Sequence, residues 1–408
     1  MAGQLIFFCF LAVIFTLSTP SLSTPAQKAR QYTRPVEFDY FSWDVNAFLT
    51  KIGQSGLNPL HALNADQQHQ LVMHYFYLTD QLEAVQAEIY QIYTDPFVED
   101  PEFTAWAELE QQKMLQTSIA SLTPMAESIL QGQVTEILVE EGIARLGEAV
   151  PPLLFHTTPL PKALIASPRD NIQQDVNISL LADLTLEQID QLENQVEKAT
   201  GESVLIVDVG GIGIYPTMVM RSSNFPWVID TISHEWTHNY LTLRPLGLNY
   251  DTTPELRTMN ETAASISGTE ISRKVLERYY PEYLSTLMDD QKLASLKWPD
   301  ETFDFRAEMH ATRVRVDEML AAGMIAEAEE YMEERRILFV AHGYEIRKLN
   351  QAYFAFHGAY ADAPGGAAGE DPVGPAVRKL REQSASLADF LRTIGKMNSF
   401  EDLQTAIR

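Results

Sequence analysis

The chain has 408 residues, a formal net charge of −26 at neutral pH and one cysteine. This length allows two or three subdomains with a sizeable core. The acidic balance argues against nucleic acid as a partner, because nucleic-acid binding needs clustered Lys and Arg. Since the single cysteine, Cys9, lies in an apolar N-terminal run, disulfides and thiol catalysis are excluded from the body of the chain.

Residues 1–23 are predicted to form a signal peptide or an anchor. The apolar run from Leu5 to Leu17 has the length of a signal-peptide core and is too short for a comfortable membrane span. Ser21-Leu22-Ser23 offers a cleavage site with small residues, so we expect a secreted or periplasmic protein. Basic residues follow the apolar run but none precedes it, which favours the alternative, a chain anchored in the membrane through this segment.

Residues 36–150 are predicted to form a helical N-terminal region. Helical apolar periodicity with few helix-breaking residues runs through 38–52, 64–95 and 101–147. The histidines of this region lack partners at metal-ligand spacing, so we expect them to lie on the surface or in packing contacts.

Residues 151–243 are predicted to form an α/β subdomain. Three segments have the composition of strands: 163–166, 176–180 and 204–209. Between the second and third, Thr185-Leu186-Glu187-Gln188 is a capping box that opens a helix to about Ala199. A further strand is predicted over 212–219, and Pro216 within it indicates a sheet edge, because proline cannot donate to a strand ladder.

The sequence His234-Glu235-Trp236-Thr237-His238 lies in a predicted helix between Pro226 and Pro245. Its two histidines are one helical turn apart and share a face, roughly 6 Å from each other, so both can bind one metal ion. Glu235 is turned about 100° around the axis and can reach a water on the metal without being a ligand. Zinc lowers the pKa of such a water, and the carboxylate takes its proton. This motif on a helix is typical of zinc-dependent peptidases.

A catalytic zinc takes three protein ligands, so a third is expected downstream. A helix is predicted from Pro254 to about Tyr279, and Glu261 lies within it among small residues. These small side chains and Gly268 allow the helix to approach another closely, which brings a short carboxylate within reach of the metal. Glu255 and Glu270 are the alternatives, but Glu255 lies in the first turn, where acids favour the helix dipole in any case.

This combination resembles the gluzincin metallopeptidases, which include thermolysin and the alanyl aminopeptidases. Both place Asn-Glu at the third ligand, as Asn260-Glu261 does here. The resemblance covers roughly residues 203–268. It implies His234, His238 and Glu261 as zinc ligands, Glu235 as general base, and an extended substrate held along the edge strand before the active-site helix.

Two features depart from that group. The gap of 22 residues between His238 and Glu261 is slightly longer than usual. Thermolysin also has an Asp four positions after its ligand Glu, where it orients a ligand histidine, and this chain has Ser265 there. Which residue orients the ligand histidines is therefore left open.

Residues 244–408 are predicted to form a helical subdomain that carries the third ligand. Within it, 303–360 is expected to contain two or three helices with a turn at Ala322-Gly323. The predicted fold class is α+β. A zincin-like core with a small mixed sheet, an edge strand and the active-site helix is flanked by large, mainly helical N- and C-terminal parts.

Gluzincins of this kind supply a Tyr or His from the helical half after the third ligand to stabilise the oxyanion. Tyr353, His357 and Tyr360 follow one another at i, i+4 and i+7 and would share one helix face. We expect His357 or Tyr360 to be the catalytic donor, because Tyr353 has aromatic neighbours to pack against. The alternative is an aromatic core face with one hydrogen-bonded histidine.

The sequence thus predicts a zinc metallopeptidase with one Zn²⁺ per chain and a peptide or protein substrate. The alternative is a catalytically idle zincin-fold protein that acts as a binding scaffold, although an idle site would not need Glu235. Whether the enzyme trims N-termini or cuts internally is open. Asp208 is only a loose candidate for holding a substrate ammonium group.

Overall fold

The computed structural model describes residues 24–55, 62–94, 98–145, 148–284, 303–344, 346–358 and 372–408. Within these ranges helices dominate, and the strands form one two-stranded and two three-stranded sheets, so the predicted α+β class is confirmed. The predicted signal segment and Tyr360 lie outside the described residues. No described helix combines the length and the apolar character that a membrane span requires.

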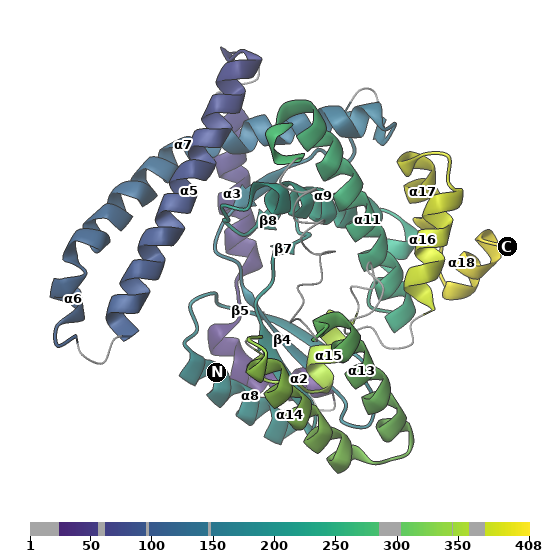
Figure 1. Ribbon diagram of the computed structural model, residues 1–408. Coiled ribbons are helices and arrows are strands. Elements are labelled where there is room, and N and C mark those ends of the chain that lie inside the picture. Colours follow the sequence, from purple (N-terminus) through teal and green to yellow (C-terminus); the bar gives the residue numbers. More distant parts are fainter. Residues whose placement is uncertain are drawn as a thin grey trace, which may run out of the picture.

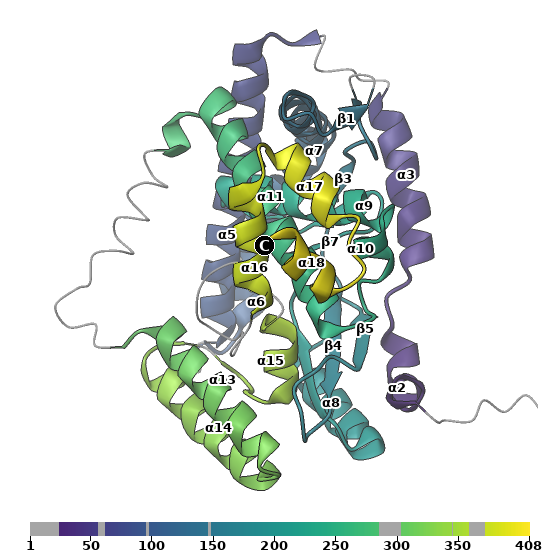
Figure 2. The same cartoon turned by 90° about the vertical axis from the view of Figure 1, so that its right-hand side faces the viewer.

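The helices predicted for the N-terminal region are present, although the helix predicted up to residue 147 ends at Glu140 and residues 144–145 form a strand. Two of these helices form a long hairpin. Helices α5 (Ala65–Thr94) and α7 (Trp106–Glu140) pack against each other, and the short α6 (Pro101–Thr104) lies at the tip of the hairpin (Figure 1). Helix α3 (Tyr40–Ser55) runs along the outside of the molecule (Figure 2). It follows α2 (Pro25–Thr33) and a short 3-10 turn.

One three-stranded sheet has β4 (Lys162–Ser167) at its centre, antiparallel to both β5 (Val176–Leu180) and β6 (Ser203–Val207). The predicted capping box is confirmed: Thr185 caps α8 (Leu186–Thr200), which connects β5 to β6. Alternate strand residues pack on α2 and α8, and the opposite set packs on α15 (Gln351–His357). Both faces are therefore covered by helices, which explains the nearly continuous apolar character of β4.

The other three-stranded sheet corrects one prediction. Its order is β3 (Phe155–Thr157), β8 (Thr217–Val219) and β7 (Gly211–Ile212), with β8 in the centre. The continuous strand predicted over 212–219 is wrong, because the chain turns between β7 and β8 and Pro216 lies in that turn. Proline fixes its own backbone angle and cannot donate a ladder bond, so the strand breaks there. The two edge strands of this sheet are β3 and β7. A small ribbon of β1 (Ala144–Arg145) and β2 (Glu148–Ala149) completes the strands.

Two helices from the centre of the chain pack against each other in the middle of the fold. Helix α9 (Phe225–Thr242) begins at Asn224, whose side chain accepts a hydrogen bond from the Trp227 amide. Helix α11 (Pro254–Tyr279) begins at Thr253 in the same manner, as predicted. The remaining helices around them are α10 (Pro245–Leu248), α16 (Val373–Gln383), α17 (Leu387–Ile394) and α18 (Phe400–Ala406).

The largest buried apolar cluster joins α5, α7, α9 and α11 with α16 and α17. A separate cluster holds α13 (Phe305–Ala321) and α14 (Ile325–Ala341) together with part of α15. These three helices confirm the prediction for 303–360, and the turn between the first two is made by Gly323 at a φ of 75°. In Figure 1 the sheet of β4 to β6, with α8, α13 and α14, lies below α9 and α11.

A buried ionic cluster ties α3 to α7 and β3. The Glu127 carboxylate accepts hydrogen bonds from Lys51 Nζ at 2.6 Å, from His156 Nδ1 at 3.1 Å and from the Thr157 amide at 2.7 Å. Burial opposes ionisation of Glu127, but the His156 hydrogen bond and the Lys51 charge outweigh it and lower its pKa to about 2. The charge of each partner is therefore compensated inside the fold.

We expect Glu127→Gln to reduce the free energy of unfolding by about 3–5 kcal/mol at pH 7, because Lys51 would remain buried without a counter-charge. Urea unfolding measures this loss. The control is Glu318→Gln, which removes an exposed ion pair with Arg315 and should cost less than about 1 kcal/mol.

The same cluster fixes a dependence on pH. Because the pKa of Glu127 is lowered in the folded state, its contribution is complete above about pH 4.5 and is lost as the pH falls towards 2. The difference between wild type and Glu127→Gln should therefore shrink between pH 5 and pH 3. An unchanged difference over that range would contradict this assignment.

Candidate metal centre

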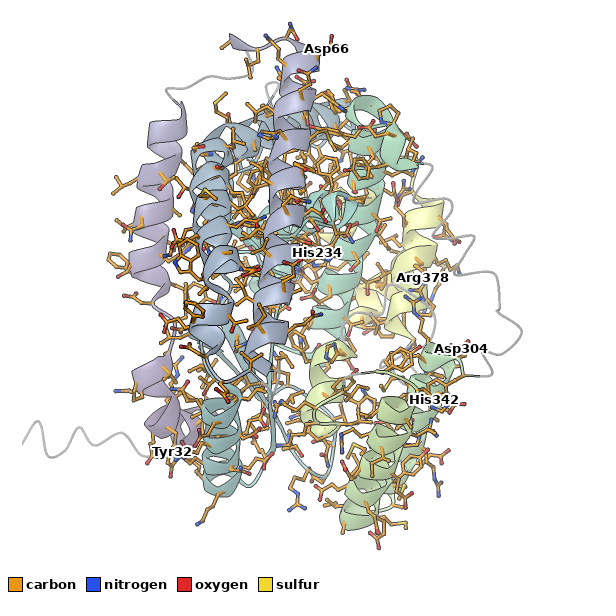
Figure 3. All side chains as sticks on the ribbon, turned by 60° about the vertical axis from the view of Figure 1, so that its left-hand side comes forward. Tyr32, Asp66, His234, Asp304, His342 and Arg378 are labelled. Atoms are coloured by element: carbon orange, nitrogen blue, oxygen red, sulfur yellow. The ribbon has the colours of Figure 1, made fainter. Side chains whose placement is uncertain are left out.

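The structure brings together the three ligands predicted from the sequence. His234 and His238 project from α9 with their Nε2 atoms 3.1 Å apart. Oε2 of Glu261, on α11, lies 3.5 Å from each of these nitrogens. The three side chains form a group that could hold a metal ion. His234 lies near the middle of the molecule (Figure 3).

Close packing of α9 and α11 makes this meeting possible. A Cβ atom at Gly268 would lie 3.0 Å from the Asp230 carbonyl oxygen and 3.1 Å from Cβ of His234. Directly before Gly268, the Ser267 hydroxyl oxygen lies 3.0 Å from that of Thr237, which is one turn after His234 on α9. The prediction that small residues on α11 permit a close approach is therefore confirmed.

The donor set fits a single zinc ion. Ligand atoms at about 2.0–2.2 Å from a tetrahedral zinc are about 3.3–3.5 Å from one another. The two spacings of 3.5 Å to Glu261 match this triangle, and the spacing of 3.1 Å between the two histidine nitrogens is slightly shorter. In addition, Oε2 of Glu261 is buried and has no hydrogen-bond partner. A buried carboxylate oxygen is costly without a partner, and a metal ion would supply one.

Three neighbours orient the ligands, which the sequence left open. Nδ1 of His238 donates to Oδ1 of Asn260 at 2.8 Å, so the lone pair of Nε2 faces the other ligands. Ser265, which stands where thermolysin has its Asp, lies 3.5 Å from Nδ1 of His234. The hydroxyl of Tyr250 donates to Oε1 of Glu261. Each ligand thus has at least one polar neighbour outside the metal position.

The ligands also neutralise one another. Burial opposes protonation of His238, but the charge of Glu261 outweighs it and raises the pKa of His238 to about 9. Burial likewise opposes ionisation of Glu261, but the two imidazoles outweigh it and hold its pKa well below the usual range. At neutral pH the proton on His238 compensates the charge of Glu261. A metal cation would replace that proton, so metal binding would release it.

Glu235 lies beside the ligands with its carboxylate against β7 and the glycine that follows it. Only 8% of the residue is exposed. A Cβ at Gly211 would lie 2.5 Å from Oε1 of Glu235, and a Cβ at Gly213 would lie 2.8 Å from Cβ of His238. Glycines at these two positions therefore leave room for the acid. Burial raises the pKa of Glu235 against the opposing effect of the two histidines, which suits a group that must accept a proton.

A cleft of about 530 Å³ opens at the ligands and separates the α9–α11 pair from the sheet of β4 to β6. Its metal side is formed by Glu235, His238 and Glu261. The opposite wall comes from β4, β5 and the end of α15, where Phe356 lines the cleft. The edge strand β7 runs along one side through Gly211 and Ile212.

The structure does not bring His357 to this cleft. Its ring packs against Tyr353 and Phe356, with centroids 4.3 and 5.0 Å away, and burial lowers its pKa to about 4. The residue next to it, Phe356, lines the cleft instead. Asp208 forms an ion pair with Lys162, and its side chain is 81% exposed.

The alternative third ligands lie elsewhere. Glu255 is exposed in the first turn of α11, and Glu270 forms an ion pair with Arg381. Sequence reasoning missed Tyr250, because it belongs to the loop between α10 and α11, where no periodicity indicates a direction. Its only signal was proximity in the chain to the third ligand.

No protein-family model, curated protein or solved structure matches this chain.

Asn260→Ala should weaken zinc binding about 10- to 100-fold, because His238 loses the acceptor that fixes its ring. Ser265→Ala should have a smaller effect, since its contact with His234 is 3.5 Å long. Competition with a chromophoric chelator measures both affinities. Equal affinities for Asn260→Ala and the parent protein would show that the amide does not orient the ligand.

Proposed function

We propose that this protein is a zinc-dependent peptidase that hydrolyses peptide bonds. In this proposal His234, His238 and Glu261 hold the zinc, and Glu235 is the general base. The observation that carries it is the ligand triangle with the unpartnered Oε2 of Glu261, placed beside a buried acid of raised pKa. A zincin-like core built on α9, α11 and β7 is part of the same proposal.

When bound, zinc would lower the pKa of a water molecule and polarise the substrate carbonyl. Glu235 would take a proton from the attacking water and pass it to the leaving nitrogen, which completes hydrolysis without a covalent intermediate. The raised pKa of Glu235 favours its role as a base that holds the proton until the amine departs. Asn260, Ser265 and Tyr250 would keep the ligands in place.

The edge of β7 gives a route for the substrate. This strand pairs with β8 on one side only, and Gly211 and Gly213 both line the cleft. An extended peptide can add to such an edge through main-chain hydrogen bonds. The absence of side chains at the two glycines would let its backbone come close to Glu235.

A catalytically idle binding scaffold is the other candidate. It would require the ligands but not a base. Gly211 and Gly213 leave space around Glu235 and His238. This space favours the peptidase over the scaffold, because a protein that only binds a partner does not need room for a general base.

Glu235→Gln should retain one zinc per chain and lose hydrolysis, because the amide cannot accept the proton. Metal analysis and digestion of a peptide library give the two readouts. Removing the metal with a chelator should also abolish hydrolysis, and added zinc should restore it. The matched control is Glu255→Gln on the exposed first turn of α11, which should keep both zinc and activity. Full activity in Glu235→Gln would overturn the mechanism.

We further propose that the Tyr250 hydroxyl donates to the oxyanion. Because it has one proton, which goes to Oε1 of Glu261 in this structure, it would turn from Glu261 to the oxyanion in the transition state. Its ring packs edge-on against His238, with centroids 6.1 Å apart, and it lines the cleft. Tyr250→Phe should lower turnover at saturating zinc by about 100- to 1,000-fold, the usual cost of losing one such donor. His357→Ala is the comparison variant. If turnover falls in His357→Ala and not in Tyr250→Phe, His357 is the donor to the oxyanion. The assignment to Tyr360 stays a prediction.

A further inference from the structure

Two basic side chains, Lys162 and Arg257, line the metal cleft. Lys162 Nζ lies 2.5 Å from Oδ1 of Asp208, so its charge is neutralised within the protein. Arg257 has a different environment. It is only 8% exposed, and among the described residues no carboxylate forms an ion pair with it. Asp251 also lines the cleft but is exposed, so solvent screens its charge.

The guanidinium of Arg257 is held but not fully satisfied. Nη1 donates to the carbonyl oxygen of Ala355 at 3.1 Å, while Nε is buried without a partner. A buried cation with neither a counter-ion nor a full set of acceptors is costly. If Arg257 served only to fasten the end of α15, a neutral donor could make the same bond without this cost.

Arg257 lies one helical turn before Glu261 and on the same face of α11. Their Cβ atoms are therefore about 6 Å apart. An extended peptide advances about 3.3–3.6 Å per residue, so the Arg257 side chain branches from α11 about two peptide residues from Glu261. A planar guanidinium matches a carboxylate, which it can bind through two parallel hydrogen bonds.

We propose that Arg257 is a specificity subsite that binds a carboxylate of the peptide substrate. This inference rests on the proposed peptidase function and names the substrate class of that site: peptides with an anionic group close to the cut bond. Such a carboxylate comes either from the C-terminus of the peptide or from an Asp or Glu side chain. The chemistry recognised is the same in both cases.

Two sets of peptides separate the sources. The first set has neutral side chains and ends either in a free carboxylate or in an amide. The second set is amidated throughout and has Glu or Gln at each of the two positions on either side of the cut. For wild-type protein loaded with zinc, kcat/KM should favour the carboxylate by about 10- to 100-fold in one set. The set that shows the preference identifies the source.

Variants then assign the preference to the residue. Arg257→Gln should bring the ratio of carboxylate to amide peptides to within about twofold of one, with the change mainly in KM. Arg257→Lys should retain part of the ratio, because it keeps the charge but loses the planar fork. Lys162→Gln is the matched control. It removes a cation from the same cleft that Asp208 already neutralises, so the ratio should stay at the wild-type value.

The outcomes distinguish this inference from the proposed function. Zinc-dependent cleavage of both kinds of peptide at equal rates by the wild type would overturn the subsite and leave the peptidase standing. A protein that binds zinc but cuts none of the peptides would overturn the peptidase and the subsite with it. If Arg257→Gln does not fold, the carboxylate-to-amide ratios of the wild type and of Arg257→Lys still test the assignment to Arg257. A preference that Arg257→Lys and Lys162→Gln lose equally would refute the assignment to Arg257.

Discussion

The distance between α9 and α11 is the constraint on which the candidate site depends. The two histidines come from one helix and the carboxylate from the other, so the ligand triangle forms only if the helices nearly touch. Gly268 permits this, since a Cβ there would lie 3.0 Å from a backbone oxygen of α9. The same helices are central to the largest apolar cluster. Metal binding and core packing would therefore stabilise one another.

The polar neighbours of the ligands follow from that arrangement. Asn260 and Ser265 lie on the face of α11 that meets α9, so one helix supplies both a ligand and the groups that orient the other two. Tyr250 reaches Glu261 from the loop before α11. Ligands on two packed helices are held more rigidly than ligands on loops. This arrangement suits a site in which a shift of 1 Å would open the triangle.

The sequence predicted most of the site because most of its residues lie close together in the chain. His234, Glu235 and His238 lie within a single helix, where spacing determines direction, and capping residues marked the starts of α8, α9 and α11. Pro216 indicated a sheet edge within one strand, not the break that it makes, since only the pairing with β3 places β8 in the sheet centre. His357 shows the limit of periodicity. A helix face can be predicted from spacing, but the surface that it meets depends on the tertiary fold.

The charges of the cleft differ from the charge of the protein as a whole. The protein is strongly acidic, and at physiological salt the field of its surface is screened within about 8–10 Å. An anionic peptide would be repelled on approach, so any preference for it has to arise from contacts inside the cleft. A divalent metal would balance Glu235 and Glu261, which leaves Arg257 as the uncompensated buried charge of that wall. A substrate carboxylate is the simplest group that would compensate it, because it brings both the charge and the acceptors that the guanidinium lacks.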